Sequence, residues 1–151
     1  MANVTQNTST KDTVDLLKEC NAGIKMGVRS FDDVIPKTKN EELKKILQKS
    51  HDEHCQLGDE THKLLLEYHM DDKDPHPIAS GMSWVKTNVM LGIKDDDKTV
   101  ADLITQGCNM GIKSLYSYLN QYAEADERVR EVTKKLIHCE ERLVDDINRY
   151  L

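Results

Sequence analysis

The chain has 151 residues, of which 38% are apolar and 32% are charged, a balance typical of one water-soluble domain. Twenty-one Lys and Arg residues against 27 Asp and Glu residues give a net charge of -6, which repels phosphate backbones and anionic lipid headgroups. No apolar run approaches the ~20 residues that a bilayer-spanning helix needs, and residues 1–12 lack the basic and apolar regions of a secretory signal. We therefore expect a cytoplasmic protein that binds neither nucleic acid nor membranes.

The residue pattern predicts helices throughout the chain. It contains three prolines and 5% aromatic residues, and it lacks the alternating Val, Ile and Thr stretches bounded by turn residues that are typical of strands. We expect an all-α fold, with residues 1–10 as a disordered tail and residues 11–151 as a single four-helix-bundle domain.

The first half of the chain predicts two helices joined by a short turn. The first helix begins near Lys11 and must end before Pro36, because a proline ring cannot continue a helix. The second begins after Asn40, a favourable N-cap residue followed by two glutamates, and continues to Tyr68.

The second half predicts another pair of helices, over residues 98–122 and 126–150. A charged segment with two prolines, residues 71–77, separates it from the first half, and a short helix is predicted over residues 78–90.

A short internal repeat supports the division into two helical hairpins. The six residues from Cys20 to Lys25 recur from Cys108 to Lys113 with five identities. Two hairpins joined by the long segment between Tyr68 and Lys98 predict a bundle with one long crossover, which is the connection used by ferritin-like bundles.

The order of elements resembles the ferritin-like superfamily over roughly residues 13–151. The resemblance is carried by the crossover residues Ser83-Trp84-Val85-Lys86 ahead of the acidic turn Gly92-Ile93-Lys94-Asp95-Asp96-Asp97. It is closest to a bacterial branch without a complete di-iron ligand set. The resemblance implies a ferritin-like four-helix bundle that assembles into oligomers.

The di-iron ligand pattern of ferritin-like oxidases is incomplete in this chain. That pattern needs a Glu from each of two helices and a Glu-x-x-His pair from each of the other two. Asp59 and His62 have the i, i+3 spacing with Asp in place of Glu, but their direction on the helix lies away from its apolar face. The third long helix has no carboxylate between Asp102 and Glu124.

The second predicted helix also carries histidine and cysteine along one strip. His51, Cys55 and His62 are separated by four and seven residues, which are near whole turns, and Asp59 lies nearby. Imidazole and thiolate are ligands that Zn, Ni or Cu prefer. A divalent metal bound by His51, Cys55, Asp59 and His62 is therefore one alternative, and a solvated helix face is the other.

His54 differs from the other histidines because it falls on the apolar face of its helix. A buried imidazole needs a partner, and Asn21 and Glu140 both occupy inward positions from which they can supply one. Two Gly-x-x-x-Gly motifs, Gly23 with Gly27 and Gly107 with Gly111, predict either close approach of helices or room for a large side chain.

No phosphate-binding loop, nucleophile elbow or catalytic triad is recognisable in the sequence. We therefore expect a non-enzymatic binding or assembly module without a cofactor. The alternative is a metal-binding protein, either a remnant of a di-iron oxidase or storage protein or one that binds Zn, Ni or Cu on the histidine and cysteine strip. Trp84 and Leu91 form a second apolar line on the predicted crossover helix. Either this helix lies in a groove of the bundle that covers both lines, or Trp84 and Leu91 contact another subunit of a homo-oligomer.

Overall fold

The computed structural model describes residues 2–70 and 96–151, with side chains from residue 7 onward. Four long helices make up nearly all of this part of the chain, and it contains no strand. They are α1 (Ala2–Val34), α2 (Glu41–Glu67), α4 (Asp97–Gln121) and α5 (Glu127–Ile147). Short 3-10 helices follow α1, at Ile35–Lys37, and α5, at Asn148–Tyr150.

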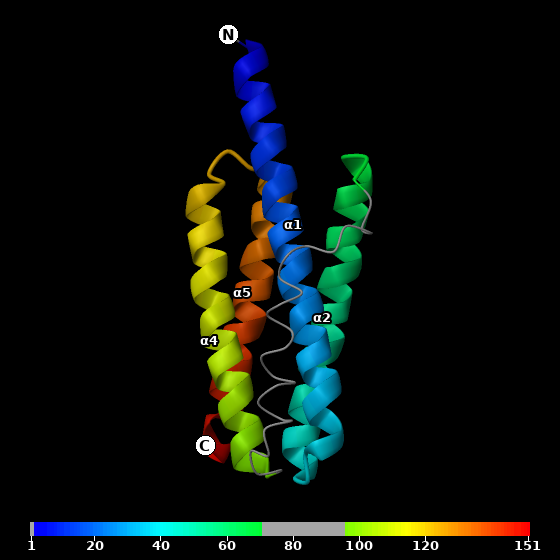
Figure 1. Ribbon diagram of the computed structural model, residues 1–151, viewed down its shortest axis with the longest axis vertical. Coiled ribbons are helices and arrows are strands. Elements are labelled where there is room, and N and C mark those ends of the chain that lie inside the picture. Colours follow the sequence, from blue (N-terminus) through cyan, green and yellow to red (C-terminus); the bar gives the residue numbers. More distant parts are fainter. Residues whose placement is uncertain (1, 71–95) are drawn as a thin grey trace.

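The four helices lie side by side as two hairpins (Figure 1). The pairs α1 with α2 and α4 with α5 run antiparallel, whereas α2 ends at the opposite end of the molecule from where α4 begins. Helices α2 and α4 therefore run in the same direction. The predicted all-α class and the four long helices are confirmed.

The starts of three helices follow from capping side chains. Asn40 Oδ1 accepts a hydrogen bond from the backbone nitrogen of Leu43 at 3.0 Å, and Asp96 and Asp126 cap α4 and α5 in the same way. Each cap satisfies a backbone donor that the first turn of a helix leaves unpaired. The predicted starts of these helices are within one residue of those observed.

The start of α1 differs from the prediction. It begins at Ala2, nine residues before Lys11, so residues 2–10 are helical and not a disordered tail. Nothing in residues 2–10 breaks a helix, since the segment contains neither proline nor glycine. Within α1, Thr13 Oγ1 donates a hydrogen bond to the carbonyl oxygen of Ser9 at 2.7 Å.

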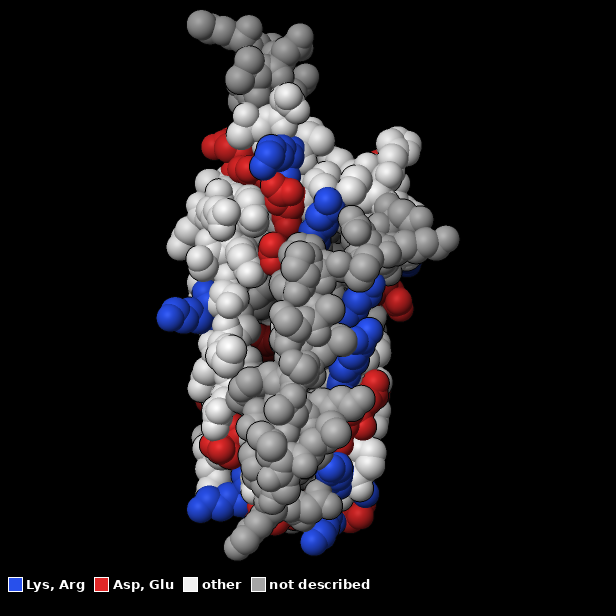
Figure 2. Space-filling view, viewed as in Figure 1, with Lys and Arg blue, Asp and Glu red and all other residues white. Residues whose placement is uncertain are grey.

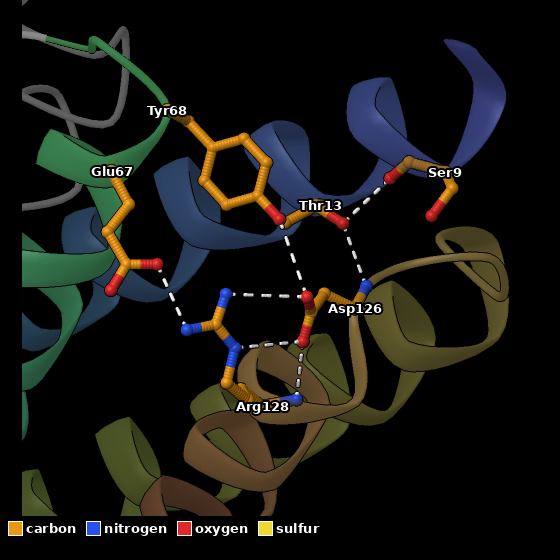
Figure 3. Close-up of polar contacts among 6 residues, drawn as sticks. All are labelled: Ser9, Thr13, Glu67, Tyr68, Asp126 and Arg128. Carbon is orange, nitrogen blue, oxygen red and sulfur yellow. Dashed lines mark hydrogen bonds and ion pairs between the residues drawn. The ribbon is translucent and has the colours of Figure 1, made fainter. Parts of the chain in front are cut away.

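Thr13 also joins α1 to the start of α5 (Figure 3). Its buried hydroxyl accepts a hydrogen bond from the backbone nitrogen of Asp126 at 2.7 Å. The Asp126 carboxylate in turn contacts Tyr68 and Arg128, and Arg128 reaches Glu67 at 3.0 Å. This end of the bundle is thus held together by polar contacts among α1, the end of α2 and the start of α5.

An aspartate side chain also fixes the connection between the two helices of each hairpin. Asp97, the first residue of α4, accepts hydrogen bonds from the backbone nitrogens of Lys39 and Asn40 at 2.8 and 3.0 Å. Asp12 of α1 similarly accepts from the backbone nitrogen of Glu124, between α4 and α5. Each hairpin connection is therefore fixed by an aspartate of the other hairpin.

The apolar core is divided into two clusters along the bundle axis. One cluster lies towards the α4–α5 connection and includes Leu16, Leu17, Leu57, Leu115 and Leu136. The other lies towards the α1–α2 connection and includes Phe31, Leu43, Leu47, Ile104 and Ile147. Between the two clusters the four helices contribute polar residues and glycines in place of large apolar ones, and these residues form the candidate site.

The predicted short helix over 78–90, with the expected interface residues Trp84 and Leu91, lies outside the described residues. Within the part of the chain that is described, no helix is long and apolar enough to cross a bilayer.

Candidate functional site

A polar level separates the two apolar clusters near the middle of the bundle. Helix α2 contributes His54 and α5 contributes Glu140, both of which are buried, with 1% and 9% of their surface exposed. Helices α1 and α4 contribute Gly27 and Gly111 at the same level. Two helices thus supply large polar side chains, and the other two supply the space that these side chains fill.

The His54 ring is held from several directions. Its Nδ1 donates a hydrogen bond to the carbonyl oxygen of Ser50 at 2.8 Å, which leaves Nε2 directed towards α5. Nε2 lies 3.8 Å from Glu140 Oε1, and Phe31 packs edge-on against the ring at 5.1 Å between centroids. Of the two partners predicted for His54, the structure brings Glu140 beside it, at an ion-pair distance longer than a direct hydrogen bond.

Asn21, the other predicted partner, is half-buried on α1. It lies almost two turns before Gly27, the α1 residue whose missing side chain leaves room for the His54 ring.

Glu140 has one oxygen in the ion pair and one without a partner. Among the described residues, its Oε2 is buried and makes no hydrogen bond. The carboxylate packs directly on the α4 backbone, since a Cβ atom at Gly111 would lie 2.6 Å from Oε2. The carboxylate therefore has its main electrostatic partner in His54.

The two ionisable groups stabilise each other's charged form. Burial by itself would lower the pKa of His54, but its contacts with Cys139 and Glu140 outweigh desolvation and raise that pKa to about 10. Burial raises the pKa of Glu140, and the nearby imidazolium opposes that shift. Near neutral pH His54 is therefore an imidazolium that faces the Glu140 carboxyl group.

A second set of contacts links this level to the protein surface. Cys139 Sγ lies 3.7 Å from His54 Nδ1 and donates to Glu53 Oε2 at 3.1 Å. The same Glu53 oxygen accepts from Arg142 at 3.3 Å, and the Arg142 side chain is exposed. The polar contacts thus run from an exposed guanidinium on α5 to the buried imidazole on α2.

The glycines explain why a bundle core tolerates so large a polar pair. A Cβ atom at Gly27 would lie 3.0 Å from His54 Cδ2, whereas one at Gly23 or Gly107 would have no atom of the described residues within 4 Å. Only the second glycine of each Gly-x-x-x-Gly motif makes room for a side chain. The prediction of room for a large side chain is therefore correct at Gly27 and Gly111.

This difference predicts opposite effects for two substitutions one helical turn apart. Gly107→Ala is expected to raise the free energy of unfolding by about 0.5–1 kcal/mol, because alanine favours the helix and its methyl group meets no atom of the described residues. Gly111→Ala is expected to lower it by about 1 kcal/mol, because the new methyl group displaces the Glu140 carboxylate from its place beside His54. Urea denaturation of both variants measures the difference, and equal effects would contradict the proposed packing.

The predicted metal ligands on α2 are only partly brought together. Cys55 Sγ lies 4.0 Å from His51 Nδ1, but the two nitrogens of His51 are each 3.2 Å from a carboxylate oxygen, one of Asp32 and one of Asp52. Asp59 is exposed and His62 is half-buried, further along the helix. Over residues 7–70 and 96–151, no three His, Cys, Asp or Glu side chains form a group that could hold a metal ion.

The buried thiols are held in their protonated form. Burial raises the pKa of Cys20 to about 11, and it also raises that of Cys108, near Glu140 and Cys139. All four cysteines are free, and Cys55 is the one that is half-buried. Cys20 and Cys108 are therefore unreactive core residues at neutral pH.

Sequence reasoning missed three residues that surround His54. Cys139 follows Leu136 by three residues and precedes Leu143 by four, so helical spacing alone places it on the inward face of α5. Ser50 contributes its backbone carbonyl and Phe31 its ring, and no sequence signal connects either of them to an imidazole.

No protein-family model, no curated protein and no solved structure matches this chain.

Proposed function

We propose that the protein is a non-enzymatic binding or assembly module, built as a ferritin-like bundle without a di-iron centre. The observation that carries this proposal is the pair of glycines at the polar level. A di-iron centre in such a bundle takes carboxylates from all four helices, but here α1 and α4 present Gly27 and Gly111. The two large polar side chains at this level, His54 and Glu140, face each other.

The arrangement of helices supports the ferritin-like part of the proposal. Helices α2 and α4 run in the same direction, which is the relation that a long crossover between two hairpins produces (Figure 1). The segment between them, residues 68–96, is long enough for such a crossover, because an extended chain spans about 3.3 Å per residue.

The pairing of His54 with Glu140 also supports a structural role over a catalytic one. A catalytic acid or base needs a lone pair or proton that a substrate can reach. His54 Nδ1 is occupied by the Ser50 carbonyl, and its Nε2 is directed towards the buried carboxylate. The imidazole and Glu140 Oε1 therefore compensate one another at this level, as a buried polar pair in a structural core does.

Elemental analysis of protein purified without an affinity tag tests the proposal. We expect no stoichiometric metal. Two irons per chain, with the absorption band of an oxo-bridged pair, would overturn it in favour of a di-iron protein. One Zn or Ni per chain that is lost in His51→Ala or Cys55→Ala, and retained in His138→Ala, would overturn it in favour of a metal binder on α2.

A further inference from the structure

The outer face of α4 differs in composition from the exposed faces of α2 and α5. From residue 103 to residue 123 the chain has a single charged residue, Lys113. The exposed uncharged residues of this stretch, which we call the uncharged α4 face, are Gln106, Asn109, Met110, Ser114, Tyr116, Ser117, Asn120, Gln121 and Ala123. Figure 2 shows the left side of the molecule, where α4 lies, as mostly white, whereas charged side chains are more frequent on the right side of this view.

Helix α5 provides the contrast. Its exposed residues are all charged or histidine: Glu127, Arg128, Glu131, Lys135, His138, Arg142, Asp145 and Asp146. Most exposed residues of α2 are also charged. A helix whose only role is to face water normally has such a charged surface. The uncharged α4 face therefore calls for an explanation beyond solubility.

Two large side chains on this face are unusually open. Met110 is 60% exposed and Tyr116 is 47% exposed, and they are two of the four large hydrophobic residues that are exposed in the described chain. Tyr and Met are enriched at protein interfaces, whereas Lys, Glu and Asp are depleted there. The composition of the face is thus that of a protein contact surface.

The charge of the whole chain favours a second copy as the partner. Two copies each carry a net charge of -6, so they repel each other unless they meet where charge is sparse. The uncharged α4 face meets that condition, since Lys113 is the single charged residue among the residues that form it. A partner of opposite charge would instead be attracted to the acidic surfaces elsewhere on the molecule.

The polar groups of the face are also suited to pairing with themselves. In a two-fold dimer the same patch lies on both sides of the contact. Asn and Gln amides and Ser hydroxyls both donate and accept hydrogen bonds, so each kind of group can pair with its own copy. A charged residue close to the two-fold axis would meet its own copy, so a face with the single charge of Lys113 pairs with itself more easily than the charged faces of α2 and α5.

We propose that a second copy of this chain docks on the uncharged α4 face, so that two bundles form a dimer through their α4 helices. This inference rests on the proposed assembly function and names its partner and surface. It places the contact on α4 in addition to, or in place of, the expected contact at Trp84 and Leu91.

Analytical ultracentrifugation of the full-length protein, from about 1 to about 100 µM, tests the inference. Gln106→Glu and Asn120→Glu each place a negative charge on the uncharged α4 face, about two turns from Lys113 and therefore too far along the helix to pair with its ammonium group. Gln56→Glu adds the same charge at an exposed position of α2, which is not adjacent to α4 in the bundle, and serves as the matched control. Both α4 positions are exposed, so all three variants are expected to keep the helical circular dichroism of the parent.

We expect a dimeric parent, a dimeric Gln56→Glu variant, and α4 variants whose dimerisation is weakened at least about tenfold, because each buries an unpaired charge. A monomeric parent over the whole range overturns the second-copy inference, while the metal analysis judges the assembly function separately. A dimeric parent whose α4 variants dimerise as strongly as Gln56→Glu also overturns it, because the contact then lies elsewhere.

Discussion

Replacing His54 with alanine is expected to lower the free energy of unfolding by about 3–5 kcal/mol. The substitution leaves a cavity beside Phe31 and leaves the Glu140 carboxylate buried without its counter-charge. Glu140 Oε2 has no hydrogen bond within the described part of the chain, so the remaining contacts of this carboxylate cannot compensate for the loss. Urea or thermal denaturation followed by circular dichroism measures the effect.

His138→Ala is the matched control, because this histidine is on α5 and its side chain is 68% exposed. The control is expected to change the free energy of unfolding by less than about 0.5 kcal/mol. A His54→Ala variant as stable as the control would contradict the burial and pairing of His54.

A double substitution separates two causes of the lower stability of His54→Ala, the unpaired Glu140 carboxylate and the cavity left by the imidazole. His54→Leu with Glu140→Met removes both charges and keeps apolar bulk at the polar level, so we expect it to be more stable than His54→Ala. If the double variant is as unstable as the single one, the effect comes from shape and not from an unpaired charge.

The free energy of unfolding is also expected to fall by about 1.2 kcal/mol as the pH rises from about 7 to about 8. Contacts with Cys139 and Glu140 raise the pKa of His54 to about 10 against the lowering effect of desolvation, whereas an unfolded histidine titrates near 6.5. Above pH 6.5 the unfolded chain has therefore released a proton that the folded chain retains. The stabilisation is complete below that pH and is lost as the pH rises towards the folded pKa.

Comparing how the free energy of unfolding changes with pH in the parent and in His54→Gln identifies the group that causes the pH dependence. Burial raises the pKa of Glu140, so this group changes the stability in the same direction as His54. The thiols of the unfolded chain begin to ionise near pH 8.5, so the measurement is restricted to pH values below about 8. In His54→Gln the free energy of unfolding is expected to lose the whole of the decrease between pH 7 and 8 that His54 causes in the parent. Parallel slopes in parent and variant would show that His54 is not protonated in the folded protein.

The sequence by itself determined the helices and where most of them begin. Asn40, Asp96 and Asp126 act through their own side chains on backbone donors two or three residues away, so local pattern suffices to place them. The inward position of His54 also followed from helical spacing alone. The predicted start of α1 near Lys11 was wrong. Residues 2–10 lack strong helical periodicity, yet they form the first turns of the helix.

Only the tertiary structure decided which groups meet at the polar level. Spacing places a residue on one face of its own helix, but the height and rotation of one helix against another depend on packing between all four. For this reason Asn21 and Glu140 were equal candidates for His54 in the sequence, and the four glycines could not be told apart. The packing brings Glu140 beside His54, with Gly27 against the imidazole and Gly111 against the carboxylate.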